Sequence, residues 1–179
     1  MDKFSGILNK LQSKFRRTEV KRKTCLVRQG EVSQFVYFVE SGCLRLWHNY
    51  EGNDVTVEFF QAGDVVGPFE CLFWNQPAEM VLEAIVPSVV NTVAKDDLLD
   101  VLYETPTFSR FLIDKLINRL ADYQHRVTSL IKANPATRYE ELEKEKPELV
   151  ALVPKHYIAS YLGITPVSLS RIRTKLQKH

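Results

Sequence analysis

The sequence predicts an α+β protein in which a β-rich N-terminal part precedes a long helix and a C-terminal helix-turn-helix. Three observations predict this order. Between Thr24 and Val93, short runs of β-branched and aromatic residues alternate with turn residues. From Phe108 to Ile131, apolar residues recur at steps of three and four, the period of a helix. From Lys155 to Leu176, two short helical patterns flank a glycine-containing turn.

The β-rich part is expected to form a sandwich or barrel, because its strand candidates recur at roughly ten-residue intervals between turns. Five of the seven glycines fall between Gly30 and Gly67, where they supply the positive φ angles that tight turns need. The strand candidates are Phe35–Val39, Cys43–Trp47, Val55–Phe60 and Val81–Val86.

Four helical segments are expected outside the helix-turn-helix. A short amphipathic helix is predicted over residues 4–15 and another ends at Tyr103. The long helix begins near Pro106 and ends at Asn134-Pro135, because the residue before a proline avoids the α region. A fourth segment, residues 136–152, is rich in Glu and Lys and is interrupted at Pro147.

The long helix offers a candidate dimer interface along one side. Its apolar seam could pack on a second copy of the chain, whereas the alternative is a core helix that packs only within its own chain. The seam residues are Leu112, Leu116, Leu120, Tyr123, Val127 and Leu130. We place the domain boundary after this helix, which gives domains over residues 1–133 and 134–179.

The segment from Lys155 to Leu176 gives the strongest indication of function. Gly163 suits the left-handed end of the first helix, Thr165 suits the N-cap of the second, and Pro166 suits its first turn. In a helix-turn-helix the second helix enters the major groove of DNA. The alternative is an αα-hairpin with a solvated basic side. The candidate DNA-binding residues are Thr165, Ser168, Ser170, Arg171, Arg173 and Lys175.

Charge supports contact with a polyanion at one place. Residues 29–133 carry seven Lys or Arg against fifteen acids, whereas residues 154–179 carry five against none. No stretch approaches the ~20 apolar residues that span a bilayer, and the N-terminus lacks the apolar run of a secretory signal. We therefore expect a cytoplasmic protein that binds double-stranded DNA and no membrane.

Enzymatic and metal chemistry find little support in the residues. There is no Ser/His/Asp set, carboxylate pair, phosphate loop or metal cluster, so we do not expect an enzyme. The three cysteines, Cys25, Cys43 and Cys71, form no CxxC pair. We expect them to be reduced thiols, and the alternative is a redox-sensing role.

The order of the parts resembles the bacterial regulator superfamily of the catabolite activator protein and the fumarate–nitrate regulator (CRP/FNR). The resemblance implies a cyclic-nucleotide-binding-type β-roll (a double-stranded β-helix), a dimerisation helix over about 106–133, and a winged-helix-like DNA-binding domain. The matching residues are Gln29-Gly30-Glu31, Gly42, Gly63-Asp64, Gly67 and the stretch ASYLGITPVSLSRIR that ends at Arg173.

The resemblance also implies that cyclic AMP is disfavoured as effector. Members that bind it use an Arg to neutralise the cyclic phosphate, yet no Lys or Arg lies between Arg45 and Lys95. Glu79 lies near the place of that Arg, and Glu70 is a displaced version of the ribose-binding Glu. The effector pocket either holds another small molecule or is filled by Phe69, Leu72, Phe73 and Trp74. Its candidate residues are Gly67, Phe69, Glu70, Cys71, Leu72 and Glu79.

Other cofactors of the family lack a signature here. Iron–sulfur members carry a Cys group near the N-terminus, where this chain has only Cys25. Haem members need axial ligands, and His48 and His125 alone do not indicate one. The cofactor is therefore left unknown.

The DNA-binding end departs from the family in two ways. The catabolite activator type has an Arg-Glu pair after the N-cap, where this chain has Pro166 and Val167. Arg171 aligns with the next arginine that contacts bases in that type. The sequence stops at His179, where many members continue into a β wing, so we expect a truncated wing and weaker backbone contacts.

The leading hypothesis is a homodimeric transcriptional regulator whose two recognition helices read a palindromic site ~34 Å apart, with RNA polymerase as a further candidate partner. The alternative is a ligand-sensing or partner-binding protein of the same fold with a degenerate DNA-binding module.

Overall fold

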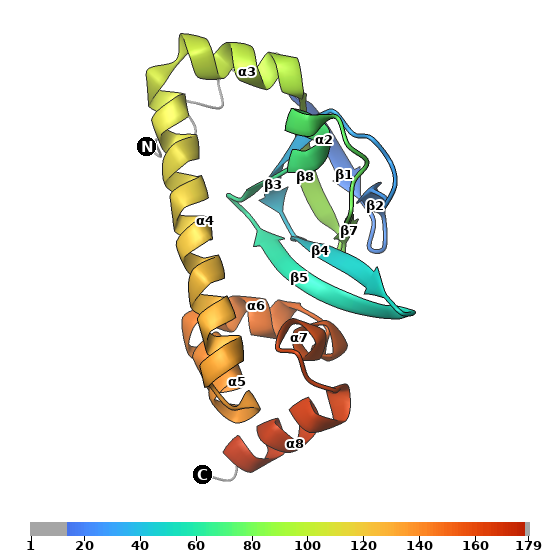
Figure 1. Ribbon diagram of the computed structural model, residues 1–179, viewed down its shortest axis with the longest axis vertical. Helices are drawn as coiled ribbons and strands as arrows, with labels where there is room; N and C mark the ends of the chain where they lie inside the picture. The colour runs from blue at the N-terminus through green and yellow to red at the C-terminus, as the bar shows by residue number, and fades with distance from the viewer. Residues whose placement is uncertain (1–13, 178–179) are drawn as a thin grey trace. The chain divides into compact units, whose positions relative to one another are not determined.

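The computed structural model describes residues 14–177, in which the strands come first, with one short helix among them, and the remaining helices follow (Figure 1). This confirms the predicted α+β class. The helix predicted over residues 4–15 lies almost wholly outside the described residues. Among the described residues, one compact unit comprises residues 14–46 together with Phe59–Arg119, and the second comprises Trp47–Glu58 together with residues 120–177. The boundary at 133/134 stays a prediction.

The strands form two sheets of four strands each. One sheet has the order β1-β8-β3-β6 and the other the order β2-β7-β4-β5, and the pairs β1–β8, β3–β8, β3–β6 and β2–β7 are antiparallel. All four predicted strand runs are present. The strands are β1 Arg16–Val20, β2 Cys25–Val27, β3 Phe35–Ser41, β4 Cys43–Tyr50, β5 Asn53–Gln61, β6 Val65–Val66, β7 Val81–Ala84 and β8 Ser88–Ala94.

Strand β3 is buried on both faces, and alternate residues serve two cores. Tyr37 and Val39 pack in a cluster that also takes Leu44 and Leu82 from the other sheet. Phe38 packs instead with helix residues such as Phe108. The two-residue period of a strand sends neighbours to opposite faces. A continuous apolar run therefore marks the place where the roll meets its covering helices.

The turn between β3 and β4 requires glycine at position 42. Gly42 has φ +88°, in the region that side chains rarely adopt, and an added Cβ would lie 2.6 Å from the carbonyl oxygen of Pro87. The hydroxyl of Ser88 accepts a hydrogen bond from the backbone N–H of Cys43 at 3.1 Å. Close contact of the turn with the β7–β8 connection thus fixes the residue type.

Proline begins four of the helices, as its fixed φ and missing N–H favour. Pro106 begins the predicted long helix, and Pro147 separates two helices within the predicted fourth segment. Asn134 caps α5, because its Oδ1 accepts from the backbone N–H of Ala136 and Thr137. The helices are α2 Phe69–Trp74, α3 Lys95–Glu104, α4 Pro106–Lys132, α5 Pro135–Glu145, α6 Pro147–Leu152, α7 Lys155–Tyr161 and α8 Pro166–Leu176. Within residues 14–177, no helix has the length and apolar character needed to cross a membrane.

Candidate nucleic-acid interface

The turn between α7 and α8 is that of the predicted helix-turn-helix. Gly163 has φ +67° and donates its N–H to the carbonyl of Ser160 at 3.0 Å. The next N–H, of Ile164, reaches back to the carbonyl of Ala159, also at 3.0 Å. This pair of bonds is how a left-handed residue closes a helix. The prediction of a helix end at Gly163 is confirmed.

The first turn of α8 is capped by a pair of hydroxyls. Thr165 is extended at the N-cap, and its Oγ1 accepts from the backbone N–H of Ser168 at 3.1 Å. The two hydroxyls, Thr165 Oγ1 and Ser168 Oγ, also lie 2.9 Å apart and share a hydrogen bond. Both side chains therefore serve the cap in the free protein, and Ser168 is half-buried.

Helix α8 has one buried and one exposed side. Leu169 is 1% exposed, and Ile172 and Leu176 are half-buried on the same side. The opposite side, which we call the outer face of α8, consists of the exposed residues Val167, Ser170, Arg171, Thr174 and Lys175. Arg can bond bidentately to guanine, and Ser can bond to base edges or phosphates. The outer face therefore has the chemistry of a recognition helix.

Arg173 is turned toward the helical scaffold rather than outward. It is half-buried, and its guanidinium interacts with the hydroxyl of Tyr139 on α5. The Tyr139 hydroxyl also donates to Glu143 at 2.7 Å. Burial is the main cause that raises the pKa of Tyr139, and Arg173 opposes it. Of the six predicted DNA-binding residues, Thr165, Ser170, Arg171 and Lys175 are exposed, whereas Ser168 and Arg173 have partners within their own unit.

Arg126 of α4 holds the first helix of the motif and the strand segment of the second unit together. Its Nη1 donates to the carbonyl of Val57 at 2.6 Å, and its Nη2 donates to the carbonyl of Tyr161 at 3.0 Å. The guanidinium also lies 4.0 Å from the centre of the Tyr161 ring. Sequence reasoning missed this residue, although an Arg in the apolar pattern of α4 was a usable signal.

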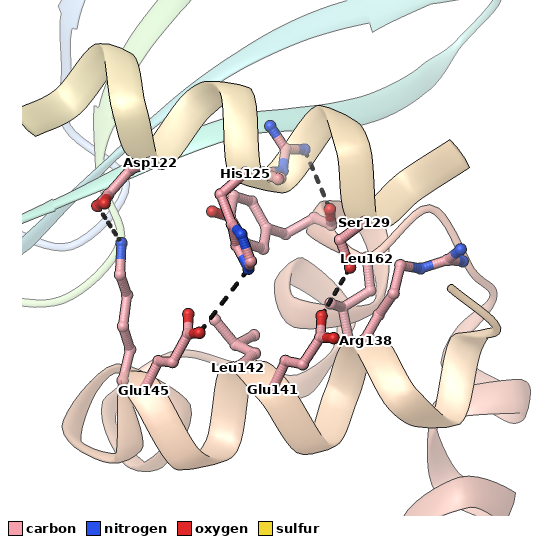
Figure 2. Close-up of a pocket in the computed structure, with 11 residues that line it drawn as sticks. Asp122, His125, Ser129, Arg138, Glu141, Leu142, Glu145 and Leu162 are labelled. Carbon is pink, nitrogen blue, oxygen red and sulfur yellow. Dashed lines mark hydrogen bonds and ion pairs between the residues drawn. The ribbon is translucent and has the colours of Figure 1, made fainter. Parts of the chain in front are cut away.

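A hollow of about 260 Å³ lies beside Arg126, between α4, α5 and the end of α7 (Figure 2). Its acidic residues already have partners: Lys146 Nζ lies 3.1 Å from Asp122, Ser129 donates to Glu141 at 2.7 Å, and His125 Nε2 lies 3.8 Å from Glu145. These pairs join α4 to α5 across the hollow (Figure 2). The hollow is therefore a polar contact between helices, and each of its carboxylates has a polar partner.

The six candidate effector residues do not all meet. Glu70 Oε1 accepts from the backbone N–H of Glu79 at 3.1 Å, and an added Cβ on Gly67 would lie 2.9 Å from Leu72. Cys71 is buried in the cluster inside the roll, whereas Leu72 is buried in the cluster against α3 and α4. Phe69 is 40% exposed. Four of these residues lie in the short helix α2 and the other two lie close to it in the sequence, and their role in effector binding stays a prediction.

The sequence offered Phe69, Leu72, Phe73 and Trp74 as residues that fill the effector pocket. This expectation is wrong for the three aromatic residues. Leu72 is buried, but Phe69, Phe73 and Trp74 are exposed, Trp74 to 70%. Phe69 and Phe73 stack with ring centres 6.3 Å apart on the outside of the helix. A helix of this length buries only its inner side, which Cys71 and Leu72 occupy.

Helix α4 packs at its start and is exposed along a stripe after that. Phe108 is buried and Leu112 is half-buried, so Leu112 differs from the other seam residues. The other predicted seam residues are exposed, together with three isoleucines that the prediction left out. We call this set the α4 stripe: Ile113, Leu116, Ile117, Leu120, Tyr123, Val127, Leu130 and Ile131. Dimerisation through it stays a prediction.

All three cysteines are free thiols, with Cys43 and Cys71 buried and Cys25 half-buried. Burial raises the pKa of the Cys43 thiol to about 12. In the part of the chain that the structure describes, no group of His, Cys, Asp or Glu is arranged to hold a metal ion.

The charged and polar groups of the first unit can be compared with what cyclic AMP needs. A cyclic phosphate needs a cation or hydrogen-bond donors. In the segment of residues 67–79, however, Glu70 is bonded to the backbone N–H of Glu79, and Pro68 lacks an N–H. The buried guanidinium of Arg45 faces Glu83, with 3.6 Å between Nη2 and Oε2. That cyclic AMP is disfavoured as effector stays a prediction.

Comparison with known proteins agrees with this organisation. The model of the cyclic nucleotide-binding domain matches residues 17–104. The chain is similar to the anaerobic regulatory protein of Pasteurella multocida, with 23% identity over 91% of this chain and 63% of that protein. It is also similar to the fumarate and nitrate reduction regulatory protein of Vibrio cholerae, with 22% identity over 91% of this chain and 69% of that protein.

The fold is shared with a solved regulator. The c-di-GMP responsive global regulator CLP of Xanthomonas campestris has a TM-score of 0.77 at 19% identity, and the match covers 97% of this chain and 92% of that one. The predicted β-roll followed by a long helix and a helix-turn-helix is thereby confirmed as a fold. The chain spans less than two thirds of the length of the Pasteurella multocida relative.

Proposed function

We propose that the chain is a DNA-binding transcriptional regulator of the superfamily of the catabolite activator protein and the fumarate–nitrate regulator, and that it acts as a homodimer. The single observation that carries the proposal is the outer face of α8. Ser170, Arg171 and Lys175 are exposed there on the second helix of a motif whose first helix is largely buried.

Charge supports the assignment of this face to DNA. From Pro154 to the end, the chain contains five Lys or Arg and no acid. Cationic side chains that contact phosphates release counterions, and this makes affinity high and strongly dependent on salt. Arg171 then supplies the base contact, because guanine offers N7 and O6 to a guanidinium. Lys175 is placed to contact the backbone.

The α4 stripe supports the homodimer. Its eight apolar residues follow one side of a 27-residue helix and are all exposed in the single chain. Apolar residues at alternating steps of three and four form a seam of the coiled-coil kind. A second copy of the same helix matches this seam in length and chemistry, so we propose that the stripe is the dimer interface.

The effector is proposed to be something other than cyclic AMP. The acidic pair Glu70 and Glu79 and the absence of any Lys or Arg from residue 46 to 94 in the sequence oppose a cyclic phosphate. Calorimetric titration of the full chain with cyclic AMP and with cyclic GMP tests this. We expect no saturable heat; micromolar saturable binding of either nucleotide contradicts the proposal.

Selection of duplex DNA from a random pool tests the DNA-binding function itself. The full chain is immobilised and the bound duplexes are sequenced over successive rounds. We expect an inverted repeat whose half-site centres lie about one helical turn apart, because two α8 helices in a two-fold dimer meet the same face of DNA. Pools that show no enriched sequence contradict the proposal and favour a degenerate DNA-binding module.

A further inference from the structure

Val167 is the most exposed apolar residue on α8. Its side chain is 61% exposed at the second position of the helix, directly after Pro166. The apolar residues that anchor α8, Leu169 and the half-buried Ile172, lie on the other side. Val167 therefore makes little contribution to the packing of its own unit, and its exposed surface is available to a partner.

Val167 shares a face with the residues expected to meet DNA. Residues three, four and seven positions apart in a helix lie on one side. From Val167 these steps reach Ser170, Arg171 and Thr174, and all four are exposed. An element that contacts Arg171 along the outer face also meets Val167 at the N-terminal end of the helix, the end that reaches base edges in a helix-turn-helix.

The polar side chains of this first turn are already occupied. Thr165 Oγ1 accepts from the Ser168 backbone and shares a hydrogen bond with the Ser168 hydroxyl. Val167 is thus the side chain of the turn that projects outward without an internal role. It has neither a donor nor an acceptor, so it cannot bond to the polar edges of bases. The apolar feature of the major groove is the 5-methyl group of thymine.

We infer that Val167 is a specificity-determining residue that contacts the 5-methyl group of a thymine in each half-site of the target DNA. The inference rests on the proposed DNA-binding function and adds a base preference to it. Arg171 selects a base pair by hydrogen bonds, and Val167 selects a thymine in the same half-site by apolar contact. Burial of one methyl group corresponds to roughly a fourfold change in affinity.

Replacing single thymines by deoxyuridine tests the contact, because only the methyl group is removed. The probe is a fluorescent duplex carrying the site selected by the full wild-type chain, and each thymine of the half-site is replaced in turn in both halves. We expect one position at which wild-type binding weakens by roughly fifteenfold, from two methyl contacts of about fourfold each. At that position the variant Val167→Ala binds both duplexes with equal affinity.

A matched variant separates this effect from a general loss of surface. Leu152→Ala also removes an exposed apolar side chain, from α6, where Leu152 is 42% exposed. It should keep both the wild-type affinity and the full penalty for deoxyuridine. Thermal unfolding of both variants should match the wild type, since neither side chain is buried.

The possible failures are distinguishable. If the wild type enriches no site, the proposed function and this inference fall together. If it enriches a site but the half-site holds no thymine, or every replacement leaves wild-type affinity unchanged, only the role of Val167 is overturned. The same holds if Val167→Ala shows the full penalty at every position.

Discussion

The hydroxyl of Ser160 on α7 accepts a hydrogen bond from the backbone N–H of Thr56 on β5, with 2.8 Å between Oγ and N. The same hydroxyl donates to the carbonyl of Asp54, also at 2.8 Å. One side chain of the helix-turn-helix therefore completes backbone hydrogen bonds of a strand segment about one hundred residues earlier. Together with Arg126, it makes residues 47–58 part of the same compact unit as the helix-turn-helix.

Ser160→Ala should destabilise the second unit. The substitution leaves the buried Thr56 N–H without its acceptor, which costs about 1–3 kcal/mol. Urea unfolding of the full chain, followed by circular dichroism, measures the loss. Ser170→Ala is the matched control, because Ser170 is exposed on α8 and should change stability by less than about 0.5 kcal/mol. Equal midpoints for the two variants contradict the assigned role.

Arg126→Ala should be more damaging than Ser160→Ala. The variant loses bonds to the Val57 and Tyr161 carbonyls and the contact with the Tyr161 ring. Hydrogen bonds from a charged donor are worth about 1.5–3 kcal/mol each. Arg126→Lys should recover little, because an ammonium cannot reproduce the planar fork. Arg110→Ala, at an exposed position of the same helix, should unfold like the wild type.

The double variant Leu120→Glu, Val127→Glu should convert a dimer into a monomer. Both residues are exposed members of the α4 stripe, so the folded chain tolerates the change while like charges oppose each other at the seam. Sedimentation equilibrium gives the mass. Asn118→Glu adds a charge at an exposed position on the opposite side of α4 and should leave the dimer intact. A monomeric wild type contradicts the interface.

Substitution of Arg171 should change base preference, whereas substitution of Arg173 should change stability. Arg171→Ala should relax base preference at one position of each half-site, by about 1–3 kcal/mol, without changing stability. Arg173→Ala removes a partner of Tyr139 and should lower stability. Binding to a panel of single-base variants of the selected site, read beside thermal unfolding, separates the two effects. An unaltered base preference in Arg171→Ala means that the outer face is assigned wrongly.

Alkaline pH should weaken the roll through Cys43. Burial raises the pKa of its thiol from 9.0 to about 12, so the folded state keeps a proton that the unfolded state releases. Stability contributed by this group is complete below pH 9 and is lost as pH rises toward 12, with a slope of up to about 1.4 kcal/mol per unit. Urea unfolding of wild type and Cys43→Ala between pH 8 and 10.5 should show the difference in stability shrinking. A difference in the free energy of unfolding that stays constant over this pH range contradicts the assigned role of Cys43.

The order of elements and the helix boundaries could be predicted because proline and glycine report them locally. Pro106, Asn134, Pro147, Gly163 and Thr165 each lie where the structure starts or ends a helix. Their signal depends on backbone angles and caps, which are fixed by the residue and its neighbours. The same reasoning located the outer face of α8, because helical periodicity separates Leu169 from Arg171.

Contacts between distant segments could not be predicted in this way. Nothing near Ser160 or Arg126 in the sequence indicates that their partners lie in residues 54–57. The aromatic residues of α2 were misjudged because bulk was taken as a sign of burial, whereas Phe73 and Trp74 project outward. Val167 was noted in the sequence only as a departure from the family's Arg-Glu pair, because its exposure on the outer face of α8 depends on how that helix packs.

The most direct test of the account is the ratio of affinities for specific and non-specific DNA. Fluorescence anisotropy with the full chain at fixed salt compares the selected duplex with a shuffled duplex of the same composition. We predict two chains per selected duplex, an affinity about a thousandfold or more above that for the shuffled one, and affinities that fall steeply with salt for both. Equal affinities for the two duplexes contradict the account.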